Sequence, residues 1–178
     1  MVFIEDQVSP KRCGHMQGKE VISHLEMVAK IKAAQKAKVD PDFMIMARTD
    51  ALNTHGLNEA IDRAQLYIKA GAEAIFIEGI KTREQLQLIP QKIKGVPLMV
   101  NILEGGLTPI FPQKILEEMG YKFIAYPITS LLITTQTVTH AMEELKNTGT
   151  TEHLLPQMAS FTDFKKLMGL DKWRKIAL

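Results

Sequence analysis

The chain has 178 residues, of which 46% are hydrophobic, so it is long enough to form one compact domain with a core and is not expected to be disordered. Its 22 Lys and Arg residues nearly balance its 20 Asp and Glu residues, which leaves a net charge of +2. This balance excludes an electrostatic nucleic-acid binder and a polybasic membrane binder. We expect a small-molecule partner instead.

The cysteine content and the first residues indicate the cellular compartment. The single cysteine, Cys13, cannot form an internal disulfide. No stretch approaches the roughly 20 apolar residues of a membrane span. The first six residues, MVFIED, enter an apolar run at once and lack the basic start of a secretory signal. We therefore expect a cytoplasmic protein with no membrane partner.

Short β-rich runs alternate with longer stretches of helical period. Each run is nearly continuous in apolar character, which is typical of parallel strands covered on both faces. The predicted strands are Val2 to Ile4, Phe43 to Ala47, Ala74 to Ile77, Leu98 to Val100 and Phe123 to Ala125.

The segments between the runs are amphipathic. Residues 57–68 place apolar side chains on one helical stripe, and Gly71 would end this helix. Similar periodicity predicts helices over residues 27–34 and 138–145. The spacing from Thr82 to Gln85 is that of a capping box, which would start another helix, and Gly120 would close one that begins near Pro112.

Five alternations of strand and helix predict an α/β fold with right-handed crossovers. A doubly wound sheet and part of a (β/α)₈ TIM-type barrel both fit this order. A polar residue at or just after each strand favours the barrel, because barrel enzymes place their catalytic groups there. These residues are Glu5, Arg48, Glu78, Asn101 and Thr129.

The domain boundary is expected after Asn147, where a Thr- and Gly-rich turn begins. Residues 1–147 would form the partial barrel and residues 148–178 a helical extension. In this extension, Phe161 to Met168 and Asp171 to Ile176 form two short helical pieces. The apolar side chains of the first piece would be buried against the body or against another subunit.

The densest chemical cluster is the segment KRCGH, residues 11–15, a few residues beyond the first predicted strand. Cations and a histidine beside one thiol favour its thiolate form, and the nearby glycines suit a loop that can close. The functional interpretation is a gated acid or base. The alternative is a solvated basic loop with an incidental cysteine.

This segment resembles the active-site loop of the isocitrate lyase and phosphoenolpyruvate mutase superfamily, in which K-[KR]-C-G-H marks the carbon–carbon lyase branch. Further segments resemble family motifs in the same order along the chain. They are EDQ at residues 5–7, ARTDA at 47–51, IE at 77–78, NILEGGLTP at 101–109 and YPIT at 126–129. The resemblance spans nearly the whole chain up to the last helices.

For the acid and metal groups, the resemblance implies that Glu5 belongs to a Mg²⁺ environment, with Mn²⁺ as a possible substitute. Cys13 would be the general acid that protonates the departing carbanion. Lys11, Arg12 and His15 would tune the thiol and hold the loop closed.

For the substrate groups, the resemblance implies that Arg48 clamps a carboxylate and that Glu78 orients Arg48 or the loop histidine. Asn101 and Thr129 would bind a second carboxylate, and Gly14 would line the substrate within the closed loop. Asp50, which follows Arg48 closely, is expected to cap or brace the next loop.

The implied activity is a Mg²⁺-dependent cleavage of 2-methylisocitrate or isocitrate to a 2-oxo acid, pyruvate or glyoxylate, and succinate. Gly105 and Gly106 keep a carboxyphosphonoenolpyruvate mutase-like or a dimethylmalate lyase-like activity open. The family commonly forms homo-oligomers, so a tetramer or a dimer with exchanged C-terminal helices is expected.

The resemblance also implies that the first predicted strand corresponds to the fourth of the barrel, so the chain would supply the C-terminal five β/α units. The family's metal-binding aspartate pair would precede them. Three interpretations follow: part of an active lyase, a catalytically incomplete half-barrel that binds a partner or a carboxylate, and an unrelated doubly wound domain.

Overall fold

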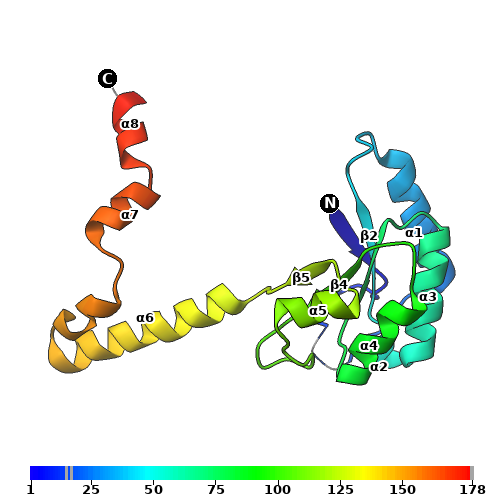
Figure 1. Ribbon diagram of the computed structural model, residues 1–178, viewed down its shortest axis with the longest axis horizontal. Coiled ribbons are helices and arrows are strands. Elements are labelled where there is room, and N and C mark those ends of the chain that lie inside the picture. The colour runs from blue at the N-terminus through cyan, green and yellow to red at the C-terminus, as the bar shows by residue number, and fades with distance from the viewer. Residues whose placement is uncertain (15, 17, 177–178) are drawn as a thin grey trace. The chain divides into compact units, whose positions relative to one another are not determined.

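A computed structural model describes residues 1–14, 16 and 18–176 (Figure 1). The strands are β1 (Val2–Glu5), β2 (Ile45–Thr49), β3 (Ala74–Ile77), β4 (Leu98–Asn101) and β5 (Phe123–Ala125). The helices are α1 (His24–Ala37), α2 (Ala51–Thr54), α3 (Leu57–Lys69), α4 (Arg83–Lys92), α5 (Gln113–Met119), α6 (Thr129–Thr148), the 3₁₀ helix η1 (Glu152–Gln157), α7 (Phe161–Leu167) and α8 (Leu170–Ile176).

The five strands form one parallel sheet in the order β1-β2-β3-β4-β5, and each strand pairs with the next along the chain. A doubly wound sheet instead reverses its strand order at a switch point. The sequential order therefore excludes the doubly wound alternative. The expectation of consecutive β/α units in barrel order is confirmed.

Strand β2 begins two positions later than its apolar run suggested. The backbone N–H of Phe43 donates to the carbonyl of Asp40 at 3.1 Å, and the N–H of Asp42 donates to Oδ1 of Asp40 at 2.9 Å. Phe43 is part of this turn and therefore lies before the strand. At the other end, the strand continues past Ala47 to Thr49. Arg48 consequently lies inside the strand, in register with Glu5 of β1.

The sheet has two different faces, because successive side chains of a strand point to opposite sides. One face packs against the helices and carries the main core, to which Ala47, Ile75, Ile77 and Val100 belong. Figure 1 shows α1 and α3 along this side, and both contact β2. The other face carries a smaller cluster built on Met46, Ala74 and Phe76, with Met44, Met99 and Phe123 packed around it.

The helix ends predicted at Thr82 and Gly120 are present, and Ser23 supplies a further cap. The hydroxyl of Ser23 caps α1 by accepting from the N–H of Glu26 at 3.1 Å. Thr82 caps α4 through the N–H of Gln85 at 3.2 Å, while the Gln85 side chain accepts from the N–H of Lys81. Gly120 ends α5 with a left-handed φ of 115°, a conformation that favours glycine.

The chain divides into two units, Met1–Thr129 and Ser130–Leu178. The division falls earlier than the expected boundary after Asn147, because α6 is one continuous helix from Thr129 to Thr148. In the second unit, no described residue of α6, α7 or α8 is buried. No helix among the described residues is long and apolar enough to cross a bilayer.

Candidate active site

Four of the predicted polar residues meet at the carboxyl end of the sheet. Two-residue periodicity puts Glu5 and Arg48 on the face of the smaller apolar cluster, beyond Phe3 and Met46 respectively. Their contacts then run from strand to strand. Arg48 Nε lies 3.2 Å from Glu5 Oε2, Arg48 Nη2 lies 3.5 Å from Glu78 Oε2, and the Asn101 amide donates to Glu78 Oε2 at 3.4 Å.

Arg48 is the centre of this network, and Asp50 is its strongest partner. The guanidinium donates from Nε to Asp50 Oδ2 at 2.9 Å and from Nη2 to Asp50 Oδ1 at 3.0 Å. Burial lowers the pKa of Arg48. The hydrogen bonds to Asp50 and the negative charges of Asp50, Glu78 and Glu5 have a larger opposite effect and hold that pKa above its usual value. Arg48 is therefore a fixed cation, and its Nη1 has no partner among the described residues.

The cysteine-bearing loop lies against this network. A Cβ placed on Gly14 would overlap Cγ of Glu78 and would lie 2.7 Å from Nη2 of Arg48, so only glycine allows the backbone to come this close. The buried ammonium of Lys19 donates to the carbonyl of Gly14 and lies 3.7 Å from Oδ1 of Asp50. The loop is thus held in a closed position over Arg48 and Glu78.

The other loop residues are placed differently from one another. The thiol-bearing Cys13 is exposed. Lys11 forms an ion pair with Glu5, with 2.6 Å between Nζ and Oε1. The backbone of Arg12 is held by Gln7, which bonds both its N–H and its carbonyl at 2.9 Å. His15 lies outside the described residues.

Thr129 makes a separate contact. Its hydroxyl donates to Oε1 of Glu104 at 2.5 Å, and among the described residues no hydrogen bond joins Thr129 to Arg48, Glu78 or Asn101. Oε2 of Glu104 is buried and has no hydrogen-bond partner in the described part of the chain. The expected pairing of Asn101 with Thr129 around one carboxylate remains a prediction.

Glu5, which was expected to lie in a Mg²⁺ environment, is paired with two cations instead. One carboxylate oxygen of Glu5 binds Lys11 and the other binds Arg48. Within residues 1–14, 16 and 18–176, no group of three His, Cys, Asp or Glu side chains could hold a metal ion. The D-x-D sequence at residues 40–42 lies in the turn before β2, at the opposite end of that strand from the site. These residues do not fit a Mg²⁺ ion by themselves.

Asp50 does more than cap or brace the next loop, and two residues with no predicted role also support the site: Lys19, which holds Gly14, and Asp6, which accepts from the backbone N–H of Asp50 at 2.9 Å. Asp50 occupies the N-cap position of α2 but makes no side-chain cap hydrogen bond, because its carboxylate binds Arg48 instead. The spacing of two residues between Arg48 and Asp50 was the available signal, since such residues share one face of an extended chain. No comparable local signal marks Lys19 or Asp6, whose contacts are tertiary.

Comparison with known proteins gives consistent matches. Residues 1–146 match the family model described as phosphoenolpyruvate phosphomutase. The 2,3-dimethylmalate lyase of Eubacterium barkeri is 45% identical over 99% of this chain and 61% of its own length. The probable 2-methylisocitrate lyase 1 of Corynebacterium glutamicum is 43% identical over 87% of this chain and 51% of its own length.

The fold of this chain is also similar to that of a solved structure. A crystal structure of 2,3-dimethylmalate lyase superposes with a TM-score of 0.89 at 36% identity, covering 98% of this chain and 58% of that one. The chain thus spans roughly half to three fifths of the length of these relatives.

Proposed function

Because this chain belongs to the phosphoenolpyruvate phosphomutase family, we propose that it supplies the loop acid and the carboxylate-binding residues of a carbon–carbon lyase. The substrate class is a small 2-hydroxy di- or tricarboxylate, cleaved by a retro-aldol reaction to a 2-oxo acid and a second carboxylic acid. The names of the relatives that share 43–45% of their aligned residues with this chain support this class.

The observation that carries the proposal is the contact between the loop and the arginine network. Gly14 lies directly on Arg48 and Glu78, and Cys13 is the residue before it in the chain. A closed loop of this kind keeps water from the reacting atoms. In this proposal the thiol of Cys13, which is exposed, would act as the proton donor at the carboxyl edge of the sheet, where barrel enzymes carry out their chemistry.

Each residue then has a definite task. Arg48 holds a substrate carboxylate through Nη1, which has no partner among the described residues, while Asp50 fixes the plane of the guanidinium. When the bond between the two carbons breaks, the electron pair stays on the carbon of the leaving acid. The Cys13 thiol gives its proton to that carbon. The 2-hydroxyl of the substrate gives its proton to solvent as the 2-oxo group forms, and the Cys13 thiolate takes a proton back from solvent, so no net proton is gained or lost.

Among substrates of this class, 2,3-dimethylmalate is our first candidate and 2-methylisocitrate our second. The first is cleaved to pyruvate and propionate, and the second to pyruvate and succinate. Both need a cation to hold a carboxylate and an acid for the leaving carbon. Gly105 and Gly106, which lie in the loop after β4, agree with the dimethylmalate lyase-like alternative from the sequence.

A second candidate function is carboxylate binding without turnover, and the poor fit of a metal favours it. Both carboxylate oxygens of Glu5 form ion pairs with cations. A bound metal ion would therefore need ligands beyond the described residues. In that case the 178-residue chain binds an acid at Arg48 but cleaves nothing.

The test joins this chain to the N-terminal part of the E. barkeri 2,3-dimethylmalate lyase and follows pyruvate release from 2,3-dimethylmalate and 2-methylisocitrate with Mg²⁺. We expect the chimera to release pyruvate, Cys13→Ser to abolish release, and the exposed control Thr150→Ser to leave it unchanged. A folded chimera that is inactive, or one whose turnover survives Cys13→Ser, would overturn the lyase proposal.

A further inference from the structure

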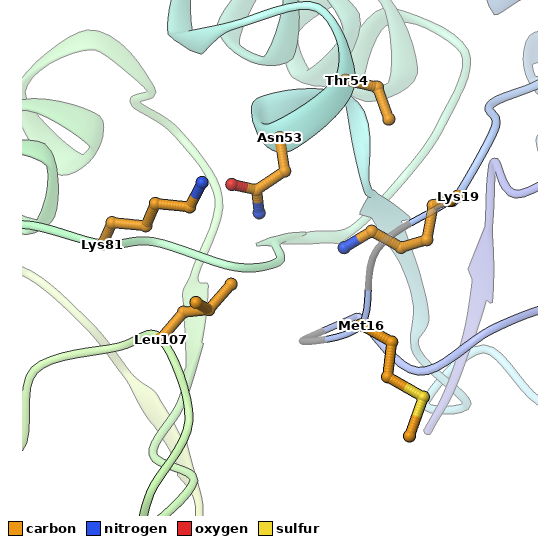
Figure 2. Close-up of a pocket in the computed structure, with 7 residues that line it drawn as sticks. Met16, Lys19, Asn53, Thr54, Lys81 and Leu107 are labelled. Carbon is orange, nitrogen blue, oxygen red and sulfur yellow. The ribbon is translucent and has the colours of Figure 1, made fainter.

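A cavity of about 530 Å³ lies beside the closed loop (Figure 2). Its walls come from the segments that follow β1, β2 and β3 and from the loop after β4. The lining residues are Met16, Gly18, Lys19, Asn53, Thr54, Lys81 and Leu107. None of them belongs to the network of Glu5, Arg48, Glu78 and Asn101.

The polar ends of three side chains converge on this space. In Figure 2 the ammonium groups of Lys19 and Lys81 point toward the middle of the cavity from opposite sides, with the amide of Asn53 between them. Asn53 donates one amide hydrogen to the carbonyl of Gly79 at 3.0 Å. Its amide group carries a second hydrogen that can serve a ligand.

The charge of the cavity is positive. Among the described residues that line it, the two lysines are the only charged ones and none is a carboxylate. The ammonium of Lys81 has no hydrogen bond or ion pair with any residue that the structure describes. A cationic cavity without an internal counter-ion attracts anions and is sensitive to salt.

The carboxylate of Asp50, the acid nearest to Lys19, does not neutralise the positive charge of the cavity. The side chain of Lys19 is only 3% exposed, and its nearest carboxylate oxygen, Oδ1 of Asp50, is 3.7 Å away. That carboxylate already accepts two hydrogen bonds from Arg48. Among the described groups, the three acids Glu5, Asp50 and Glu78 are matched by Lys11, Arg48 and Lys19, which leaves Lys81 as surplus charge.

We propose that this cavity binds a small anion that carries carboxylate or phosphate groups, between Lys19 and Lys81 and against the amide of Asn53. The volume falls within the range of about 300 to 1,000 Å³ that is typical of small-molecule sites. Lysine suits both ligand chemistries, because it acts as a point charge rather than as a planar fork. The proposal does not depend on the lyase activity, since no catalytic residue takes part.

Occupancy of the cavity would also act on the loop. Lys19 contacts the carbonyl of Gly14, and Gly14 lies against Arg48 and Glu78. An anion that fixes Lys19 therefore favours the closed position of the loop. By reciprocity, a closed loop binds the anion more tightly.

The experiment titrates the 178-residue chain with inorganic phosphate and, separately, with succinate at constant ionic strength. Isothermal calorimetry measures the affinity, and amide NMR spectra report the position through the signals of Gly18 and Leu107. We expect one of the two probes to bind saturably, and the probe that binds identifies the chemistry of the ligand. Lys81→Met should weaken this binding by about tenfold or more, because it removes a charge-assisted contact.

Two variants complete the test. Lys81→Arg should restore binding, because it keeps the charge at an exposed position. Lys122→Met, an exposed lysine at the N-terminal end of β5 and thus at the other end of the sheet, should leave the affinity unchanged. If neither probe binds, or if binding survives Lys81→Met or is lost equally in Lys122→Met, the cavity is not an anion site.

Discussion

Tyr67 of α3 donates a 2.8 Å hydrogen bond to Oδ2 of Asp6, which directly follows β1. Asp6 also accepts from the Thr49 hydroxyl at 2.7 Å, from the Asp50 backbone at 2.9 Å and from Arg63 at 3.2 Å. Asp6 is fully buried and lies on the helix side of the sheet, while Glu5 beside it faces the site. This carboxylate therefore fixes the backbone of Asp50, whose side chain holds Arg48.

Replacing Asp6 by Asn should strongly destabilise the fold. The amide would leave the guanidinium of Arg63 without its buried charge partner and would set an N–H against neighbours that are donors. We expect a loss of about 3 kcal/mol in the free energy of unfolding. Tyr67→Phe removes only one donor and should cost about 1 kcal/mol. Urea unfolding at neutral pH measures both, and an Asp6→Asn loss no greater than that of Tyr67→Phe would contradict this account.

Gly14→Ala should open the loop without unfolding the domain. The added methyl group would overlap Cγ of Glu78 and Nη2 of Arg48, and both side chains are held by their own partners. Hydrogen exchange at residues 11–14 should therefore become faster, by about tenfold or more if loop closure is worth about 1.4 kcal/mol. Gly106→Ala in the exposed loop after β4 is the control. Unchanged exchange in Gly14→Ala would show that the loop does not rest on Arg48.

The sequence predicts the strands well because each strand is a local, nearly continuous apolar run. It predicts the network of Glu5, Arg48, Glu78 and Asn101 because a parallel sheet collects the residues at its strand ends on one edge. It does not predict that Lys11 binds Glu5 or that Lys19 holds Gly14. Those contacts depend on the path of an irregular loop, for which side-chain periodicity gives no information.

The start of β2 shows a second limit. Phe43 and Met44 continue the apolar run before Ile45, so composition alone places the strand too early. Two hydrogen bonds to Asp40 form a turn over residues 40–43, and the strand begins after this turn. Asp and Pro at positions 40–42 are typical turn residues. Giving them more weight than the apolar run would have corrected the boundary.

Glu73 should make the stability of the fold depend on pH in the acid range. Hydrogen bonds from Lys38, the Ile45 backbone and Gln35 lower the pKa of Glu73 to about 2 from 4.5. A lowered pKa in the folded state means that the stabilisation is present above pH 4.5 and is lost as the pH falls toward 2. The side chain is 37% exposed, so solvent screening reduces the effect to about 1 kcal/mol.

The measurement for Glu73 compares Glu73→Gln with the parent chain by urea unfolding at several pH values. The difference in unfolding free energy should be full at pH 6 and should shrink between pH 4.5 and 2. Glu118→Gln, at an exposed position of α5, provides a matched loss of one carboxylate and should show no such trend. A difference that stays constant down to pH 2 would rule out the ionised Glu73 as its source.

The second unit should associate with another copy of the chain, because its helices lack a core of their own. Phe161, Leu167, Trp173 and Ile176 are each more than 60% exposed, which is costly for large apolar side chains in water. We expect sedimentation to show concentration-dependent association, with the emission of Trp173 moving to shorter wavelengths. Leu167→Glu should weaken association, whereas Thr162→Glu, an exposed polar position on the same helix, should not. A chain that stays monomeric with an unchanged emission spectrum would show that these side chains remain in water.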